Sequence, residues 1–395
     1  MRGFLAAVAL AAAISTSAAA QTWRGSWAAP PGLPQAAAAN AQPNRATPLI
    51  NNQTVVQYVR LSAGGARLRL RLTNEYGDKP LEVGRVRVAL LDGAGRPLPG
   101  RVREVTFSGA ASVTVPARAP LLSDAVDLSV PALAQLKISL YFPGEAGPCS
   151  CHARGEQLAD VSPPGDYTDK PFKPAATTQA RTFLSAVEVE GGRRGPVIVT
   201  LGDSITDGFG STVGANRRWP DRLAERLGGR AAVVNAGISG NRVLSVGAIP
   251  IFGESALARF DRDVLSVPGA THMIVLEGVN DLGARPSPPA EALIAGYRQL
   301  IARAHAQGIK VILATIVPYE GAAYFRPEGE AARTAVNQWI RAQREADGVI
   351  DFDAVVRDPA RPTRMRADFQ VGDWLHPNDA GYRAMGDAVP LGLLR

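Results

Sequence analysis

Cysteine, histidine and aromatic residues are scarce in this chain, and each shortage excludes a kind of function. Of its 395 residues, 2 are cysteine and 4 are histidine, and aromatic residues make up 6%. So few soft ligands argue against a bound metal, and we expect no metal and no cofactor. Binding to nucleic acid needs a concentrated basic patch interleaved with stacking aromatics. The formal net charge is +7, but the basic residues are almost all arginines scattered along the chain, so we expect no nucleic-acid partner.

Long apolar runs are also missing, except at the start of the chain. Arg2 is followed by an apolar run over residues 4–14 and by small residues that end at Ala20, which is the layout of a secretory signal peptide. The run is too short to span a bilayer comfortably, and no later run approaches the necessary length. We therefore expect a signal peptide over residues 1–20 and a secreted or periplasmic product without stable membrane insertion. An uncleaved anchor is the alternative.

The two cysteines, Cys149 and Cys151, are separated by a single serine. Export permits a disulfide, although cysteines this close can bridge only in a constrained loop geometry. A local clip and a pair of free thiols therefore both remain open.

The length of the chain suggests two domains. Residues 21–190 contain short apolar or alternating runs separated by turn signals, a pattern that favours an antiparallel sandwich. The runs cover residues 54–62, 66–73, 83–91, 104–107, 112–115, 137–141 and 182–189. Residues 149–175 are rich in proline and glycine, and we expect them to fold over the neighbouring domain. Residues 191–195 are the natural linker. Whether this domain binds glycan or only supports its neighbour is left open.

Residues 196–395 alternate strand-like and helix-like segments. The pattern predicts strands over residues 196–201, 231–235, 272–276, 310–315 and 349–352. It predicts helices over residues 219–227, 256–264, 289–307 and 329–346, and a last helix from about residue 379. Strands joined through helices imply a parallel sheet with right-handed crossovers and helices on both faces.

The first of these strands leads directly to a serine. Residues 197–201 read as a buried parallel strand, and Gly202-Asp203-Ser204 follows it. In open α/β sheets, ligands bind beyond the carboxyl ends of the strands, where Ser204 would lie. Far downstream, Asp373 and His376 supply a carboxylate and a base, so the chain holds the three parts of an activated nucleophile. Taken alone, Ser204 would more often be the N-cap of a helix.

Two further blocks lie between the serine and the histidine. Residues 235–241, Asn-Ala-Gly-Ile-Ser-Gly-Asn, follow the apolar run 231–234, and residues 277–281, Glu-Gly-Val-Asn-Asp, follow the run 273–276. Each block is a turn after a strand, so each is expected on the same edge of the sheet as Ser204. With these blocks in this order, the chain from Pro196 to Arg395 resembles the SGNH (GDSL-type) hydrolase family.

The resemblance implies a fold and a role for each matching residue. The fold is a three-layer, flavodoxin-like α/β domain with a parallel sheet, here preceded by the all-β, sandwich-like domain. Ser204 corresponds to the nucleophile, His376 to the base and Asp373 to the group that orients the base. The oxyanion donors correspond to the backbone N–H groups of Ser204 and Gly240 and to the side chain of Asn280. Removing one such donor typically costs roughly 3–4 kcal/mol of transition-state stabilisation.

The whole-chain layout is similar to exported members of this family that include xylan esterases and arylesterases. It implies an exported serine esterase that hydrolyses carboxylic esters, with short acyl chains preferred, through an acyl-enzyme. The substrate would be a small ester or an acylated polysaccharide. Two alternatives remain: an acyltransferase that passes the acyl group to a glycan, and a non-catalytic protein that binds glycan or the cell envelope. Phosphoester chemistry is more distant, because nothing indicates a second metal site near Asp203, Asp207, Asp373 and His376.

Other polar residues near these blocks are expected to be structural. Asp207 is predicted to hold the turn after Ser204 rather than to take part in chemistry. His152, His272 and His305 are given no role.

Overall fold

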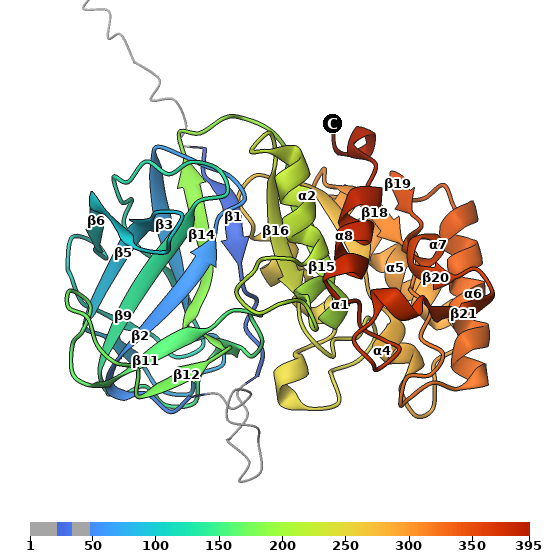
Figure 1. Cartoon of the computed structure of the whole chain (residues 1–395), viewed down its shortest axis with the longest axis horizontal. Coiled ribbons are helices and arrows are strands. Elements are labelled where there is room, and N and C mark those ends of the chain that lie inside the picture. Colours follow the sequence, from blue (N-terminus) through green and yellow to red (C-terminus); the bar gives the residue numbers. More distant parts are fainter. Residues whose placement is uncertain (1–21, 34–47) are drawn as a thin grey trace, which may run out of the picture.

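The computed structural model describes residues 22–33 and 48–395. The signal peptide predicted over residues 1–20 lies outside this part. An N-terminal half built of strands lies beside a C-terminal half of alternating strands and helices (Figure 1). Among the described residues, no helix is long and apolar enough to cross a membrane.

The N-terminal half, which we call the β region, contains antiparallel sheets, as the alternating runs predicted. A six-stranded sheet has the order β12-β11-β2-β9-β5-β6, and a four-stranded sheet has the order β1-β14-β3-β8. Leu68, Leu70 and Leu72 of β3 are fully buried, and the arginines between them face the other side. The strands are β1 (Arg24–Ala28), β2 (Asn51–Arg60), β3 (Arg67–Thr73), β4 (Leu81–Val83), β5 (Arg85–Leu91), β6 (Pro97–Val105), β7 (Val113–Val115), β8 (Pro120–Leu122), β9 (Gln135–Glu145), β10 (Cys151–His152), β11 (Ala159–Pro164), β12 (Ala176–Thr178), β13 (Arg181–Thr182) and β14 (Leu184–Glu190).

The prediction for residues 149–175 is only partly correct. Strand β11 lies inside the six-stranded sheet, between β12 and β2, so this stretch does not fold over the neighbour as a whole. Its inward-facing Ala159 and Val161 are buried, and the prolines that hid the strand pattern lie at its far end. The part before β11 reaches the C-terminal half, where the carbonyl of Glu156 accepts from the N–H of Gly214. In the same part of the chain, Cys149 and Cys151 are joined by a disulfide.

The C-terminal half contains a parallel sheet of five strands in the order β16-β15-β17-β18-β19. The strands are β15 (Val197–Gly202), β16 (Ala232–Gly237), β17 (Ala270–Leu276), β18 (Lys310–Ala314) and β19 (Gly348–Ile350). In chain order this is the flavodoxin-like arrangement, and its switch point lies at the carboxyl end of the first strand. The fold therefore places the turn after β15, which carries Ser204, where ligands bind in such sheets.

Helices lie on both faces of this sheet, with α2 beside α8 and α5 beside α6 (Figure 1). They are α1 (Ser204–Asp207), α2 (Trp219–Leu227), α3 (Ala256–Phe260), α4 (Val279–Leu282), α5 (Ala290–His305), α6 (Pro327–Ala342), α7 (Phe352–Val356) and α8 (Asp379–Ala388). Strands β20 (Arg357–Asp358) and β21 (Arg361–Met365) form a separate hairpin. The helix predicted over 329–346 ends early, because Gln343 turns to an extended backbone and its side chain accepts from the N–H groups of Glu345 and Ala346.

The two halves share a broad interface. Strand β1, which the sequence did not reveal, packs beside the edge strand β16, and the buried apolar side chains of both halves form one continuous cluster. Gly25 in β1 donates to the carbonyl of Pro268, and Ser62 accepts from the N–H of Val233 at 3.0 Å. Covering β16 removes an open sheet edge.

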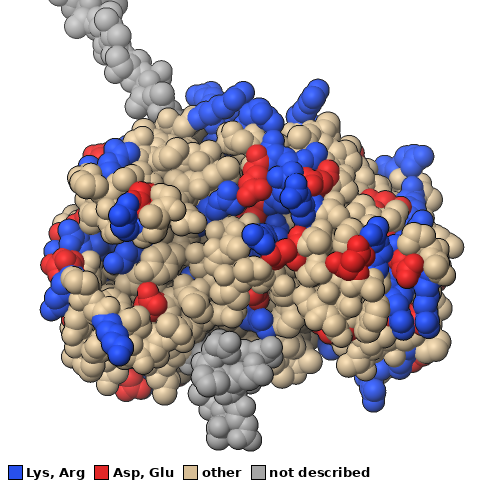
Figure 2. All heavy atoms as spheres, viewed as in Figure 1, with Lys and Arg blue, Asp and Glu red and all other residues tan. Residues whose placement is uncertain are grey.

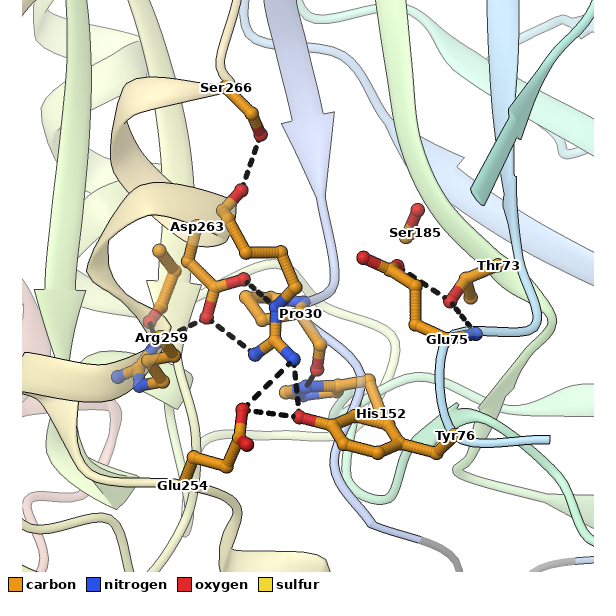
Figure 3. A network of polar contacts seen from close by, with 12 residues as sticks. Pro30, Thr73, Glu75, Tyr76, His152, Ser185, Glu254, Arg259, Asp263 and Ser266 are labelled. Atoms are coloured by element: carbon orange, nitrogen blue, oxygen red, sulfur yellow. Dashed lines mark hydrogen bonds and ion pairs between the residues drawn. The ribbon is translucent and has the colours of Figure 1, made fainter. Parts of the chain in front are cut away.

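Polar contacts also cross the interface. The hydroxyl of Tyr76 in the β region donates to Glu254 at 2.8 Å and accepts from Arg262, which also binds Asp263 (Figure 3). Asp263 in turn accepts from the buried Arg259 at 2.9 Å. This chain of contacts connects a loop of the β region to the arginine below the carboxyl ends of β15 and β16.

Charged side chains of both signs are interspersed over the face seen in Figure 2. Many arginines form ion pairs, such as Arg222 with Asp387 at 2.6 Å and Arg298 with Glu345 at 2.8 Å. In these pairs a neighbouring carboxylate balances the charge of the arginine.

Candidate active site

The turn after β15 presents Ser204. Every residue of β15 is buried, and Asp203 follows it as the N-cap of α1, its side chain accepting from the N–H of Ile205 at 2.9 Å. Ser204 is therefore the first residue of the helix and not its cap. A residue in this position has a backbone N–H without a partner inside the helix, and the helix N-terminus favours negative charge.

Ser204, His376 and Asp373 lie in one hydrogen-bonded series. The Oγ of Ser204 is 2.8 Å from Nε2 of His376, and Nδ1 of His376 is 2.6 Å from Oδ2 of Asp373. The other oxygen of Asp373 accepts from the N–H groups of Leu375 and His376, at 3.0 and 2.9 Å. Because the carboxylate can only accept, Nδ1 carries the proton and Nε2 is left to accept from the serine.

The charge of Asp373 follows from the same contacts. Partial burial favours the neutral carboxyl, but the hydrogen bonds from the ring and the backbone of His376 outweigh it and lower the pKa of Asp373 to about 2. The ring of Phe209 stacks on His376 with 4.1 Å between ring centroids, which further limits how the imidazole can turn. The histidine is thus fixed from two sides.

The predicted oxyanion donors lie at the carboxyl edge of the same sheet. Gly240 follows β16 with φ +79°, and the ring of Phe252 occupies the space where a Cβ would lie. Asn280 lies in α4 after β17, and its amide donates to the carbonyl of Asn241 at 3.0 Å. Tyr324 donates to the oxygen of the same amide at 3.2 Å, which fixes its orientation and leaves one N–H of Asn280 for another acceptor.

A buried polar cluster lies below these turns, and the sequence reasoning missed it. The side chain of Arg259 is inaccessible to solvent and donates to the carbonyls of Gly202 and Ala236, at 3.0 and 2.7 Å, and to the side chain of Asn241 at 2.9 Å. It therefore ties the end of β15 to the end of β16. Nothing in the sequence around Arg259 signals this, because its partners come from distant blocks.

Three acidic residues of this cluster have raised pKa values, whereas contacts with Arg262 and Arg259 outweigh burial and lower the pKa of Asp263. Burial raises the pKa of Asp203 to about 7 and that of Asp281 to about 6, and it raises the pKa of Glu277 well above its ordinary value. Asp281 accepts from the N–H groups of Val243 and Leu244, at 2.8 and 3.0 Å, and so holds the loop beyond Gly240. The three acids with raised pKa values lie within the blocks that predicted the site, but their burial could not be read from spacing.

Asp207 holds a turn, as predicted, and it also contacts two residues from other segments of the chain. Its Oδ2 accepts from both the N–H and the hydroxyl of Ser239, at 3.1 and 2.6 Å, and its Oδ1 lies 2.9 Å from Nε2 of His152. His152, which was given no role from the sequence, is therefore brought from the β region to the turn after the nucleophile. His305 pairs with Asp347, and His272 lies in β17 beside Thr271, both away from the site.

The acidic residues considered for phosphoester chemistry do not gather into one cluster. Asp203 caps α1, Asp207 binds Ser239 and His152, and Asp373 binds His376. Within residues 22–33 and 48–395, no group of three or more histidine, cysteine, aspartate or glutamate side chains is arranged to hold a metal ion.

A flavodoxin-like sheet with serine, histidine and aspartate in series at its carboxyl edge is the architecture of one class of serine hydrolase. Within that class, residues 200–384 match the model of the GDSL-like Lipase/Acylhydrolase family.

Individual relatives were also found. An acetylxylan esterase of Xylanibacter ruminicola is 26% identical over 217 residues, which is 49% of this chain and 42% of that protein. The match thus spans less than half of the curated relative. A solved aryl esterase of M. smegmatis is 17% identical and covers 49% of this chain and 96% of its own, with a TM-score of 0.41. A carbohydrate acetylesterase from Sinorhizobium meliloti is 14% identical with the same coverage, with a TM-score of 0.40.

Proposed function

We propose that this protein is an exported serine esterase that removes short acyl groups, acetyl above all, from carboxylic esters through an acyl-enzyme. Ser204 is the nucleophile, His376 the general base and Asp373 the group that orients it. The observation that carries the proposal is the continuous series from Asp373 through His376 to Ser204, with contacts of 2.6 and 2.8 Å. The match of residues 200–384 to the family model supports the same chemistry.

The reaction follows from the direction of these hydrogen bonds. Oγ of Ser204 attacks the ester carbonyl as its proton passes to Nε2 of His376, and the carbonyl oxygen becomes an oxyanion. The N–H groups of Ser204 and Gly240 and the free amide N–H of Asn280 stabilise that charge. Collapse of the intermediate expels the alcohol, which takes the proton from Nε2. Water then repeats the sequence on the acyl-enzyme and releases the acid.

Acetylated carbohydrate is the substrate class that we favour. The support is the similarity to an acetylxylan esterase. Export is supported by the signal-peptide layout of residues 1–20 and by the disulfide between Cys149 and Cys151, since disulfides persist in oxidising compartments.

The test is a series of aryl esters of increasing acyl length, run beside acetylated xylan and pectin. The proposal predicts turnover that is fastest for acetyl esters and that is lost in Ser204→Ala by several orders of magnitude. Ser211→Ala, on the same segment, is the matched control and should retain activity. Turnover by Ser204→Ala at the wild-type rate would remove the proposal. Product analysis with a glycan acceptor present separates hydrolysis from acyl transfer, because only transfer yields a newly acylated glycan.

A further inference from the structure

His152 is a buried histidine in the β region whose ring nitrogens meet only acceptors. Its Nδ1 lies 3.0 Å from the carbonyl of Pro30, and its Nε2 lies 2.8 Å from the carbonyl of Arg154 and 2.9 Å from Asp207 (Figure 3 shows the side facing Pro30). A neutral imidazole has one N–H, so one of its nitrogens would point a lone pair at an oxygen. The imidazolium donates from both nitrogens and fits all these contacts.

The surroundings of the ring favour the same protonation state. Burial opposes the positive charge, but the carboxylate of Asp207 and the two carbonyls raise the pKa of His152 above its ordinary value. The ring is 5% exposed and Asp207 is 3% exposed. The pair is therefore a desolvated, charge-assisted contact, which is stronger than an ion pair at the surface.

Asp207 passes this contact on to the oxyanion turn. One oxygen faces His152, and the other accepts from the N–H and the hydroxyl of Ser239, the residue before Gly240. The backbone of Asp207 also lies directly against the end of β16, where a Cβ on Gly237 would come within 2.3 Å of the Asp207 nitrogen. A shift of Asp207 would therefore move Ser239 and Gly240.

The same segment of the β region also reaches His376, but indirectly, through the ring of Phe209. The guanidinium of Arg154 lies over the ring of Phe209, 4.0 Å from its centroid, and Phe209 stacks on His376. The carbonyl of Glu156 accepts from the N–H of Gly214 at 3.0 Å, and the disulfide at Cys149–Cys151 closes the segment from the other side. The segment that carries His152 is thus held against the C-terminal half at several points.

We propose that His152 is a positioning residue of the esterase site: from the β region it holds Asp207, and through Asp207 it holds the Ser239–Gly240 turn in the geometry that oxyanion stabilisation needs. The inference rests on the proposed function, because it assigns a role within that reaction. It also gives the β region a part in catalysis. Without a donor from His152, a buried carboxylate loses its partner, and the turn relaxes to solvate it.

The kinetic test compares His152→Leu, which removes both donors, with the wild-type protein. The expected result is a fall in kcat of roughly 10- to 100-fold for an aryl acetate, with KM changed by less than about threefold, because the turn acts on the transition state. His152→Gln keeps a donor to Asp207 without the charge and should lie between. Arg60→Gln is the matched control, since Arg60 also contacts the C-terminal half, at Glu225, but is not part of the site. It should keep the wild-type kcat.

A second measurement tests the inference without relying on turnover. Hydrogen exchange followed by mass spectrometry should show faster exchange for the peptide around Ser239 and Gly240 in His152→Leu and, to a smaller extent, in His152→Gln. Arg60→Gln should leave this peptide unchanged. Equal protection of this peptide in all the proteins would overturn the inference, whether or not the wild-type protein is active. Faster exchange in His152→Leu together with an inactive wild-type protein would mean that the proposed function alone had failed. With an active protein, kcat of His152→Leu equal to that of Arg60→Gln would also overturn it.

Discussion

At the scale of single residues, Asp373 shows how a few contacts define both orientation and charge. It accepts from the ring and backbone of His376 and from the backbone of Leu375. With its pKa lowered to about 2, it is ionised throughout the range in which such an enzyme would work. Its carboxylate is therefore a constant partner, and changes of activity above about pH 4 must come from other groups.

Asp373→Asn tests this residue directly. The amide can present an N–H to Nδ1 of His376 and so favour the wrong tautomer, and kcat should fall roughly a thousand- to ten-thousandfold with a smaller change in KM. The melting temperature should stay close to the wild-type value. Lower stability with kcat unchanged would mean that Asp373 only shapes the loop before α8.

At the scale of elements, close packing of α1 on β16 sets the distance between the turn that carries Ser204 and the turn that carries Gly240. Gly237→Ala would place a Cβ 2.3 Å from the backbone nitrogen of Asp207, where no side chain can move aside. We expect a loss of stability of about 1–3 kcal/mol, measured by denaturant unfolding. Gly93→Ala is the control, because its Cβ would have no neighbour within 4 Å. Equal stability of the two variants would show that α1 is not packed as described.

The sequence predicted most elements of the C-terminal half, because buried parallel strands read as apolar runs and the helices between them have a clear period. It also indicated the turns that carry Ser204, Gly240 and Asn280. It did not reveal β1 or β11. Both segments are short and contain polar residues or proline, and they become strands because they pair with neighbouring strands of a sheet. His152 and Arg259 were missed for a related reason: their partners are distant in sequence, and only the assembled interface brings them together.

At the scale of the whole molecule, buried groups with raised pKa values make stability depend on pH. Burial raises the pKa of Asp203 to about 7 and of Asp281 to about 6, and the pKa of His152 is raised as well. Such groups bind protons more tightly in the folded state, so their stabilisation is full below their unfolded pKa values and is lost as pH rises through the folded ones. The pH range over which the two acids lose this stabilisation begins at their ordinary pKa of about 4. For the histidine it begins at its ordinary pKa of about 6.5.

The melting temperature should therefore fall as pH rises from about 5 to about 8, as measured by scanning calorimetry. His152→Gln should show a shallower fall above about pH 6.5, because its side chain does not titrate. Charged groups facing the histidine and Asp207, namely Glu156, Arg154, Arg181 and Arg218, remain in both proteins. A melting temperature that is constant or rises over this range would contradict the assignment of these buried proton-binding groups.

The central claim is that Ser204 carries the acyl group during ester hydrolysis. The most direct measurement is rapid acid quenching of the protein mixed with an aryl acetate, followed by mass spectrometry of its peptides. The account predicts one acetyl group on the peptide that contains Ser204, present during turnover and absent in Ser204→Ala. Turnover without any acylated peptide, or an acetyl group on another residue that is required for activity, would contradict it.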